Sequence, residues 1–136
     1  MQETTFELSN RPELARPASI LVVDDDRDSR EALQGILELD GYDVRCAADG
    51  PSALIVAASF VPDIVFLDIH MPQMDGYDVC QRMRRMGKLH GARIFALTAL
   101  DTERHAQRCV LAGFDGRLTK PLNPQRLTQL LRPRTH

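Results

Sequence analysis

The sequence lacks a basic excess, a cysteine framework and a long apolar run. Its formal net charge at pH 7 is −2, which argues against direct nucleic-acid binding because phosphate backbones are bound mainly by clustered Lys and Arg. The three cysteines are scattered, without CxxC spacing, and predict thiols of a reducing compartment rather than disulfides or a zinc site. No apolar segment reaches the roughly 18 residues that span a membrane. We therefore expect a cytoplasmic protein without a membrane partner, unless the chain is a piece of a membrane-anchored one.

Four short runs, mostly apolar, each end at a reactive side chain. The runs cover residues 20–23, 64–67, 94–97 and 117–119. They are followed by Asp24 and Asp25, by Asp68, by Thr98 and by Lys120. Runs of this kind are typical of buried parallel strands, whose carboxyl ends lie at one edge of the sheet. Three carboxylates, a hydroxyl and an ammonium at that edge predict a phosphoryl-transfer site with a metal ion.

Between the runs the hydrophobic period alternates between strand and helix five times. The pattern predicts a further strand at 44–47 and helices at about 28–39, 51–60, 76–86, 102–112 and 124–131. Asp75, Asp101 or Thr102, and Asn123 are the expected N-caps. The expected buried helix residues are Leu33, Ile36 and Leu37; Val79, Cys80, Met83 and Met86; Ala106, Cys109 and Val110; and Leu127, Leu130 and Leu131. Five strand–helix units with right-handed crossovers predict one doubly wound α/β domain over residues 19–132. Residues 1–18 are expected to form a polar tail or linker and residues 133–136 a short C-terminal tail.

Four motifs in register carry a family resemblance. They are the acidic pair in ILVVDDD, Asp68 in FLDIHMPQMDG, Thr98 followed by a small residue, and Lys120-Pro121 in LTKP. Over about residues 18–132 the chain resembles the receiver domain of two-component response regulators, including chemotaxis regulators. The resemblance implies a flavodoxin-like fold with strand order 2-1-3-4-5 and a cis Lys120-Pro121 peptide bond.

The resemblance also implies roles for the residues at the strand ends. Asp68 would accept a phosphoryl group from a histidine kinase or a histidine phosphotransfer protein, with Thr98 and Lys120 contacting that group. Asp25, Asp68 and the backbone carbonyl of His70 would ligate Mg²⁺ directly, and Asp24 through water. Independently, two carboxylates about 5 Å apart repel by roughly 3 kcal/mol at an effective dielectric of 20, and a hard cation relieves that repulsion.

Two further positions near the expected site, Arg117 and His70, have features of their own. Receivers often carry an aromatic residue three positions before the lysine, where this chain has Arg117, and we expect altered output through that charge. The His70 side chain is expected at the mouth of the site, either tuning access of water or simply exposed on a loop. We assign no role to the other three histidines, which are His90, His105 and His136.

Three functional alternatives follow from the sequence. The first is a phosphoacceptor switch that acts catalytically only on itself, with an unknown downstream target; it could be a single-domain regulator, a phosphorelay shuttle or the receiver of a hybrid kinase. The second is an aspartyl phosphatase that resembles the haloacid dehalogenase family, with Asp24 and Asp26 as its D-x-D pair. Members of that family normally continue with Gly and Thr or Val, whereas Arg27 and Asp28 follow here. The third is a binding module that has abandoned phosphorylation.

Overall fold

Five parallel strands form the centre of the domain. The computed structural model describes residues 17–99 and 102–132; the rest of the expected tails and Asp101 lie outside the described residues. The strands are β1 (Ser19–Val23), β2 (Asp43–Ala47), β3 (Ile64–Asp68), β4 (Arg93–Thr98) and β5 (Gly116–Thr119). They are ordered β2-β1-β3-β4-β5, so the expected doubly wound, flavodoxin-like topology is confirmed.

Each strand is followed by a helix that begins at a side-chain cap. The helices are α3 (Arg27–Leu39), α4 (Gly50–Phe60), α5 (Gly76–Arg84), α6 (Glu103–Ala112) and α7 (Pro124–Leu131), with a short 3₁₀ helix η1 (Gly87–Leu89) after α5. The caps are Asp26, Asp49, Asp75, Thr102 and Asn123, whose side chains accept backbone N–H groups of the first turn. Within the described ranges, no helix is both long and apolar enough to cross a bilayer.

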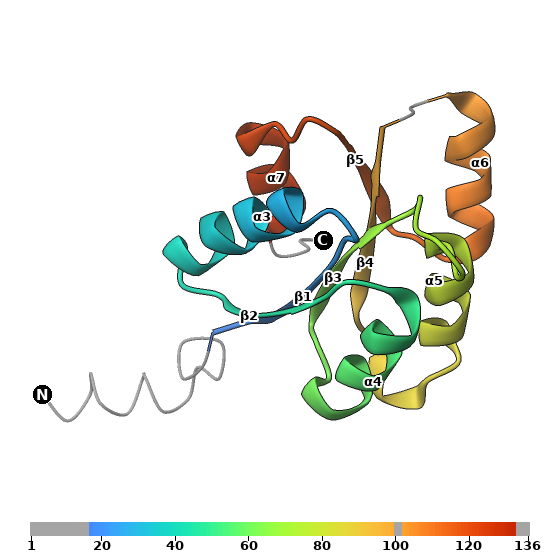
Figure 1. Ribbon diagram of the computed structural model, residues 1–136, viewed down its shortest axis with the longest axis horizontal. Coiled ribbons are helices and arrows are strands. Elements are labelled where there is room, and N and C mark those ends of the chain that lie inside the picture. Colours follow the sequence, from blue (N-terminus) through green and yellow to red (C-terminus); the bar gives the residue numbers. More distant parts are fainter. Residues whose placement is uncertain (1–16, 100–101, 133–136) are drawn as a thin grey trace, which may run out of the picture.

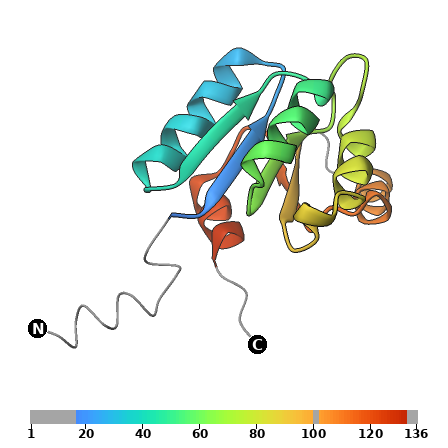
Figure 2. The ribbon, with the colours of Figure 1, turned by 90° about the horizontal axis from the view of Figure 1, so that it is seen from below.

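The helices form one layer on each face of the sheet (Figures 1 and 2). Helices α3 and α7 lie on one face, and α4, α5 and α6 lie on the other. Successive residues of a strand point to opposite faces. Accordingly, Leu21 and Val23 pack with the α4–α6 layer, and Ile20 and Val22 pack with α3 and α7. Both faces of the sheet are therefore buried, and the free carboxyl edge is where polar side chains collect.

Five of the expected buried helix residues are placed differently. Ile36 is 38% exposed and Val110 is 71% exposed, whereas Leu37 and Cys109 beside them in the sequence are buried. Adjacent helix residues lie about 100° apart, so a neighbour of a core residue can face solvent. Met86 lies beyond the end of α5 and is only partly buried. Ala106 and Leu130 are also only partly buried.

Candidate functional site

Three carboxylates gather at the carboxyl edge of the two central strands. Asp24 directly follows β1, and Asp68 is the last residue of β3. These strands are neighbours, with Val23 opposite Leu67. One oxygen from each of Asp24, Asp25 and Asp68 lies within 4.8 Å of the others. Asp24 and Asp68 are buried, at 1% and 6% exposure, whereas Asp25 is exposed, so the cluster opens to solvent on one side.

Asp24 is held by contacts on three of its oxygens. Its Oδ1 accepts the backbone N–H of Asp26 at 3.0 Å, and its Oδ2 accepts Lys120 Nζ at 2.9 Å. Its backbone carbonyl accepts Arg30 Nη1 at 2.8 Å. The first turn of α3 and the end of β5 thus fix the orientation of this buried carboxylate.

Lys120 reaches the cluster from the chain that leaves β5. Its Nζ also lies 3.5 Å from Asp68 Oδ2, so one ammonium links both buried carboxylates. The Lys120-Pro121 peptide bond is cis, and the Lys120 N–H donates to the Thr98 carbonyl at 2.8 Å. Burial lowers the pKa of the ammonium, but hydrogen bonding to Asp24 and the charges of Asp68 and Asp24 outweigh burial and raise that pKa overall. Lys120 is therefore a fixed positive charge at neutral pH.

The Asp68 carboxyl group lies in an environment that disfavours its charge. Burial first, and then contact with Asp24, raise its pKa to about 7, against the opposing attraction of Lys120. Its Oδ1 accepts the His70 backbone N–H at 3.1 Å. Additional positive charge at the cluster would favour the ionised form, which is the nucleophilic one.

The loop after Asp68 returns close against the end of β3 at Gly76. A Cβ at position 76 would lie 2.5 Å from the Asp68 carbonyl oxygen and 2.7 Å from Ile69 Cα, and the Gly76 N–H donates to the Ile69 carbonyl at 2.9 Å. These contacts are with backbone, which cannot move aside as a flexible side chain can. Gly76 therefore permits the close approach that closes the loop.

The other expected site residues are placed as follows. Thr98 is the last residue of β4 and is fully buried; it lies one residue beyond Leu97, the Cα partner of Asp68. His70 is exposed in the β3–α5 loop. Arg117 pairs with Ala96, upstream of the strand ends, so the structure does not bring it to the carboxylate cluster.

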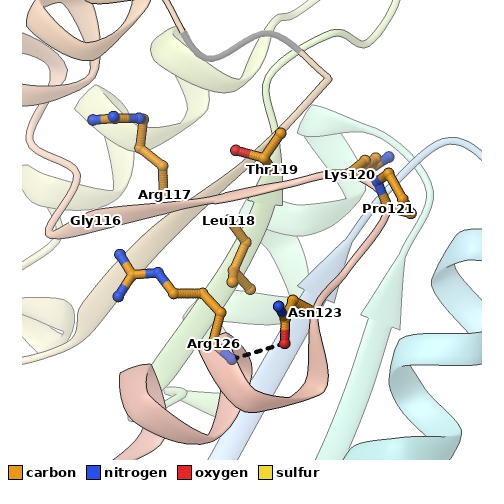
Figure 3. Close-up of a pocket in the computed structure, with 8 residues that line it drawn as sticks. All are labelled: Gly116, Arg117, Leu118, Thr119, Lys120, Pro121, Asn123 and Arg126. Atoms are coloured by element: carbon orange, nitrogen blue, oxygen red, sulfur yellow. Dashed lines mark hydrogen bonds between the residues drawn. The ribbon is translucent and has the colours of Figure 1, made fainter.

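Arg117 instead lines a cavity of about 520 Å³ that follows β5. Figure 3 shows Arg117 and Thr119 on one face of the strand and Leu118 on the other, with Lys120 and Pro121 beyond them at the end of the strand. Arg126 and Asn123 of the α7 segment complete the wall, where Asn123 Oδ1 accepts the Arg126 N–H at 3.3 Å. The site and this cavity share only Lys120 among the residues discussed.

Two residues that support the site were not singled out from the sequence for that purpose. Arg30 binds the Asp24 carbonyl, and Asp26 both donates its N–H to Asp24 and caps α3 through Ser29. The D-x-x-S spacing of Asp26 and Ser29 is a recognisable N-cap signal. The role of Arg30 depends on the path of the chain after β1, which has no comparable signal.

The residues present fit a hard divalent cation. Asp24, Asp25 and Asp68 offer oxygen ligands of the kind Mg²⁺ prefers. Within residues 17–99 and 102–132, the single ammonium in contact with the cluster does not balance three carboxylates. The arrangement can therefore hold a metal ion beside a nucleophilic carboxylate.

Sequence and structure comparisons agree with this geometry. The family model of the response regulator receiver domain matches residues 20–132. Response regulator MprA of Mycolicibacterium vanbaalenii is 42% identical over 116 residues, which are 85% of this chain and 49% of the relative. MprA of Mycobacterium bovis is 42% identical over 113 residues, 83% of this chain and 48% of the relative. The chain thus spans about half the length of the curated relatives it matches.

Similar solved structures include a chemotaxis protein and the receiver domain of a histidine kinase. Chemotaxis protein CheY4 of Vibrio cholerae superposes with a TM-score of 0.81 at 32% identity, covering 85% of this chain and 96% of CheY4. The receiver domain of a signal transduction histidine kinase from Syntrophus aciditrophicus gives 0.75 at 31% identity, covering 83% and 86%. From the match over almost its whole described length, this chain belongs to the response regulator receiver domain family.

Proposed function

We propose that this receiver domain accepts a phosphoryl group on Asp68 from a histidine of a kinase or phosphotransfer protein, in a Mg²⁺-dependent reaction in the cytoplasm. The observation that carries the proposal is the link from Lys120 Nζ to both Asp24 and Asp68 within a cluster of three carboxylates. A structural ion pair would need only one carboxylate. The surplus acidic groups have a clear use if they hold a cation beside the acceptor.

Each residue has a defined part in the transfer. An Asp68 carboxylate oxygen attacks phosphorus, an O–P bond forms, and the P–N bond to the donor histidine breaks. Lys120 can leave its contact with Asp68 and bind a phosphoryl oxygen, and the Thr98 hydroxyl can donate to another. When bound by Asp25, Asp68, the His70 carbonyl and, through water, Asp24, Mg²⁺ would offset negative charge on the attacking and transferring oxygens. The domain would act catalytically only on its own phosphorylation and dephosphorylation.

We further propose that Arg117 takes part in output to the downstream target. One charged hydrogen bond from Thr98 supplies roughly 1.5 to 3 kcal/mol, whereas a shift from 1:99 to 99:1 needs about 5.5 kcal/mol. Either other groups contribute or the shift is partial, and Arg117 is a candidate contributor because it lines the β5 cavity that ends at Lys120. Substituting Arg117→Ala should change the affinity for the target in the phosphorylated form. Unchanged affinity in both forms would contradict this role.

The aspartyl phosphatase alternative is disfavoured by the position of Asp26. Its Oδ2 accepts both the backbone N–H and the hydroxyl of Ser29, at 3.1 and 2.6 Å, which commits it to capping α3. The acid of the D-x-D pair is therefore engaged at the start of α3.

The test is phosphorylation with a small phosphodonor such as acetyl phosphate, followed by intact mass spectrometry. We expect a single phosphoryl adduct on the wild type in Mg²⁺, none in EDTA and none on Asp68→Asn. Asp43→Asn, which changes an exposed carboxylate of β2, is the matched control and should be phosphorylated normally. An adduct on Asp68→Asn would overturn the assignment of the acceptor, and an adduct that forms equally in EDTA would overturn the metal requirement.

A further inference from the structure

Two histidines meet beside the acceptor loop, outside the carboxylate cluster. His70 in the β3–α5 loop and His105 in the first turn of α6 have ring centroids 6.2 Å apart, at an interplanar angle of 63°. Both line a cavity of about 360 Å³, together with Asp75, Tyr77 and Arg108. Two imidazoles and one carboxylate therefore line the same cavity.

One nitrogen of the His105 ring contacts an oxygen atom, as the non-ligating nitrogen of a metal-bound histidine commonly does. Its Nδ1 lies 2.7 Å from the Thr102 hydroxyl oxygen, and that oxygen also accepts the His105 backbone N–H at 3.3 Å. In protein metal sites, a ligating histidine commonly donates its second ring N–H to an oxygen atom, which fixes the tautomer. If Nδ1 carries the proton to Thr102, the lone pair of Nε2 remains for a metal ion.

The separation of the two rings suits one shared ion after a small movement. An imidazole centre lies roughly 3.2 Å from a metal bound through one ring nitrogen, so two rings on a tetrahedral ion have centres roughly 5 Å apart. His70 is exposed on its loop, so its side chain can make the shift of about 1 Å by rotation.

The charges around the cavity permit a cation. Asp75 brings a carboxylate, although its Oδ1 also accepts the Asp78 N–H at 2.9 Å as the cap of α5. Arg108 brings an opposing positive charge, but its guanidinium carbon lies 4.1 Å from the Tyr77 ring centroid, where the face of the ring partly offsets that charge. Water molecules would complete the coordination of an ion held by two imidazoles.

We propose that His70 and His105 form a second metal site, which takes a transition metal ion with a preference for nitrogen ligands, such as Ni²⁺ or Zn²⁺. The carboxylate cluster offers only oxygen ligands and suits Mg²⁺, whereas imidazole suits Ni²⁺ and Zn²⁺. His70 follows Asp68 by two residues, and its backbone N–H donates to the Asp68 carboxylate. An ion bound by His70 and His105 would therefore link the β3–α5 loop beside Asp68 to α6.

The experiment is calorimetric titration of the purified chain with Ni²⁺ in a large excess of Mg²⁺, which occupies oxygen-only sites. We expect one Ni²⁺ per chain, with at least tenfold weaker binding in His70→Ala and in His105→Ala. His90→Ala is the matched control, because His90 is an exposed histidine outside the cavity, and it should bind Ni²⁺ as the wild type does. Asp68→Asn should also bind Ni²⁺ normally, so the outcome does not depend on phosphoacceptor chemistry.

Three results would overturn the site. Wild-type affinity in either cavity variant would place the ion on other ligands. Loss of binding in Asp68→Asn, or its abolition by Mg²⁺, would place the ion at the carboxylate cluster. Paramagnetic broadening by Ni²⁺ provides an independent readout: the amide resonances of the β3–α5 loop and the first turn of α6 should broaden in the wild type, and broadening elsewhere alone would contradict the proposal.

Discussion

The Asp68 carboxyl group is destabilised in its charged form, and this should appear in the stability of the metal-free protein. Its folded-state pKa of about 7 lies above the ordinary value of 3.8 because of burial and contact with Asp24. A carboxyl with a raised pKa contributes fully to stability below about pH 4, and that contribution is lost as the pH rises through 7. We expect the free energy of unfolding to fall by about 1 to 3 kcal/mol between pH 5 and pH 8 from this group. Denaturant titrations in EDTA would measure it.

The control for this prediction is the variant that cannot ionise. Asp68→Asn should lose less stability between the two pH values than the wild type, and Asp43→Asn should behave as the wild type does. Asp24→Asn is a poorer test, because it also removes the 2.9 Å contact with Lys120. Equal pH dependence in the wild type and Asp68→Asn would show that charge on Asp68 is not disfavoured in the fold.

The three cysteines should differ sharply in reactivity. Cys46 is partly exposed, whereas Cys80 and Cys109 are buried, and burial raises the pKa of the Cys80 thiol to about 12. Since the thiolate is the reactive species, iodoacetamide should modify Cys46 well before Cys80 or Cys109 in the native protein. Peptide mass spectrometry over time would measure the three rates. Modification of Cys80 at the rate of Cys46 would contradict the packing of α5.

Among the elements, strands and helix starts were predictable, but some buried helix positions were not. The caps Asp75, Thr102 and Asn123 precede their helices as expected, because the cap is a local interaction between a side chain and the next turn. The expectation that Ile36 and Val110 are buried was wrong. Periodicity marks an apolar stripe, but the width of the stripe that a neighbouring layer covers depends on the packing of distant segments.

Two helical glycines, Gly76 and Gly35, differ in the reason for the missing side chain. At Gly76 the backbone of another segment approaches closely, whereas at Gly35 there is open space. Gly76→Ala should destabilise the fold by about 1 to 3 kcal/mol and lower the phosphorylation rate, because its Cβ would press on the backbone of Asp68 and Ile69. Gly35 lies within α3, and apart from the backbone of its own helix no atom of the described residues lies within 4 Å of an added Cβ. Gly35→Ala should therefore stabilise the fold by about 0.5 to 1 kcal/mol. Chemical denaturation of both variants checks the pair. An unchanged free energy of unfolding in Gly76→Ala would mean that the loop does not need the close approach of position 76 to the backbone of Asp68 and Ile69.

For the whole molecule, the topology decides which side chains meet. Parallel strands bring their carboxyl ends to one edge, so the meeting of Asp24, Asp68 and Lys120 could be expected from their positions after the runs. The strand order came from the family resemblance and is confirmed. The closer contact of Lys120 with Asp24 than with Asp68, and the approach of His70 to His105, depend on the paths of the connecting loops, for which the sequence has no comparable pattern.

We propose that this fold directs phosphorylation to Asp68, and the chemical position of the phosphoryl group is the most direct test. Borohydride reduces an aspartyl phosphate to homoserine, which survives digestion and can be located by peptide sequencing in a mass spectrometer. After treatment with a phosphodonor and Mg²⁺, we expect homoserine at position 68 and aspartate at positions 24 and 25. Homoserine at position 24 would favour the phosphatase-like chemistry. Reduction at no position, despite a stable fold and bound Mg²⁺, would contradict the phosphoacceptor function and favour a binding module.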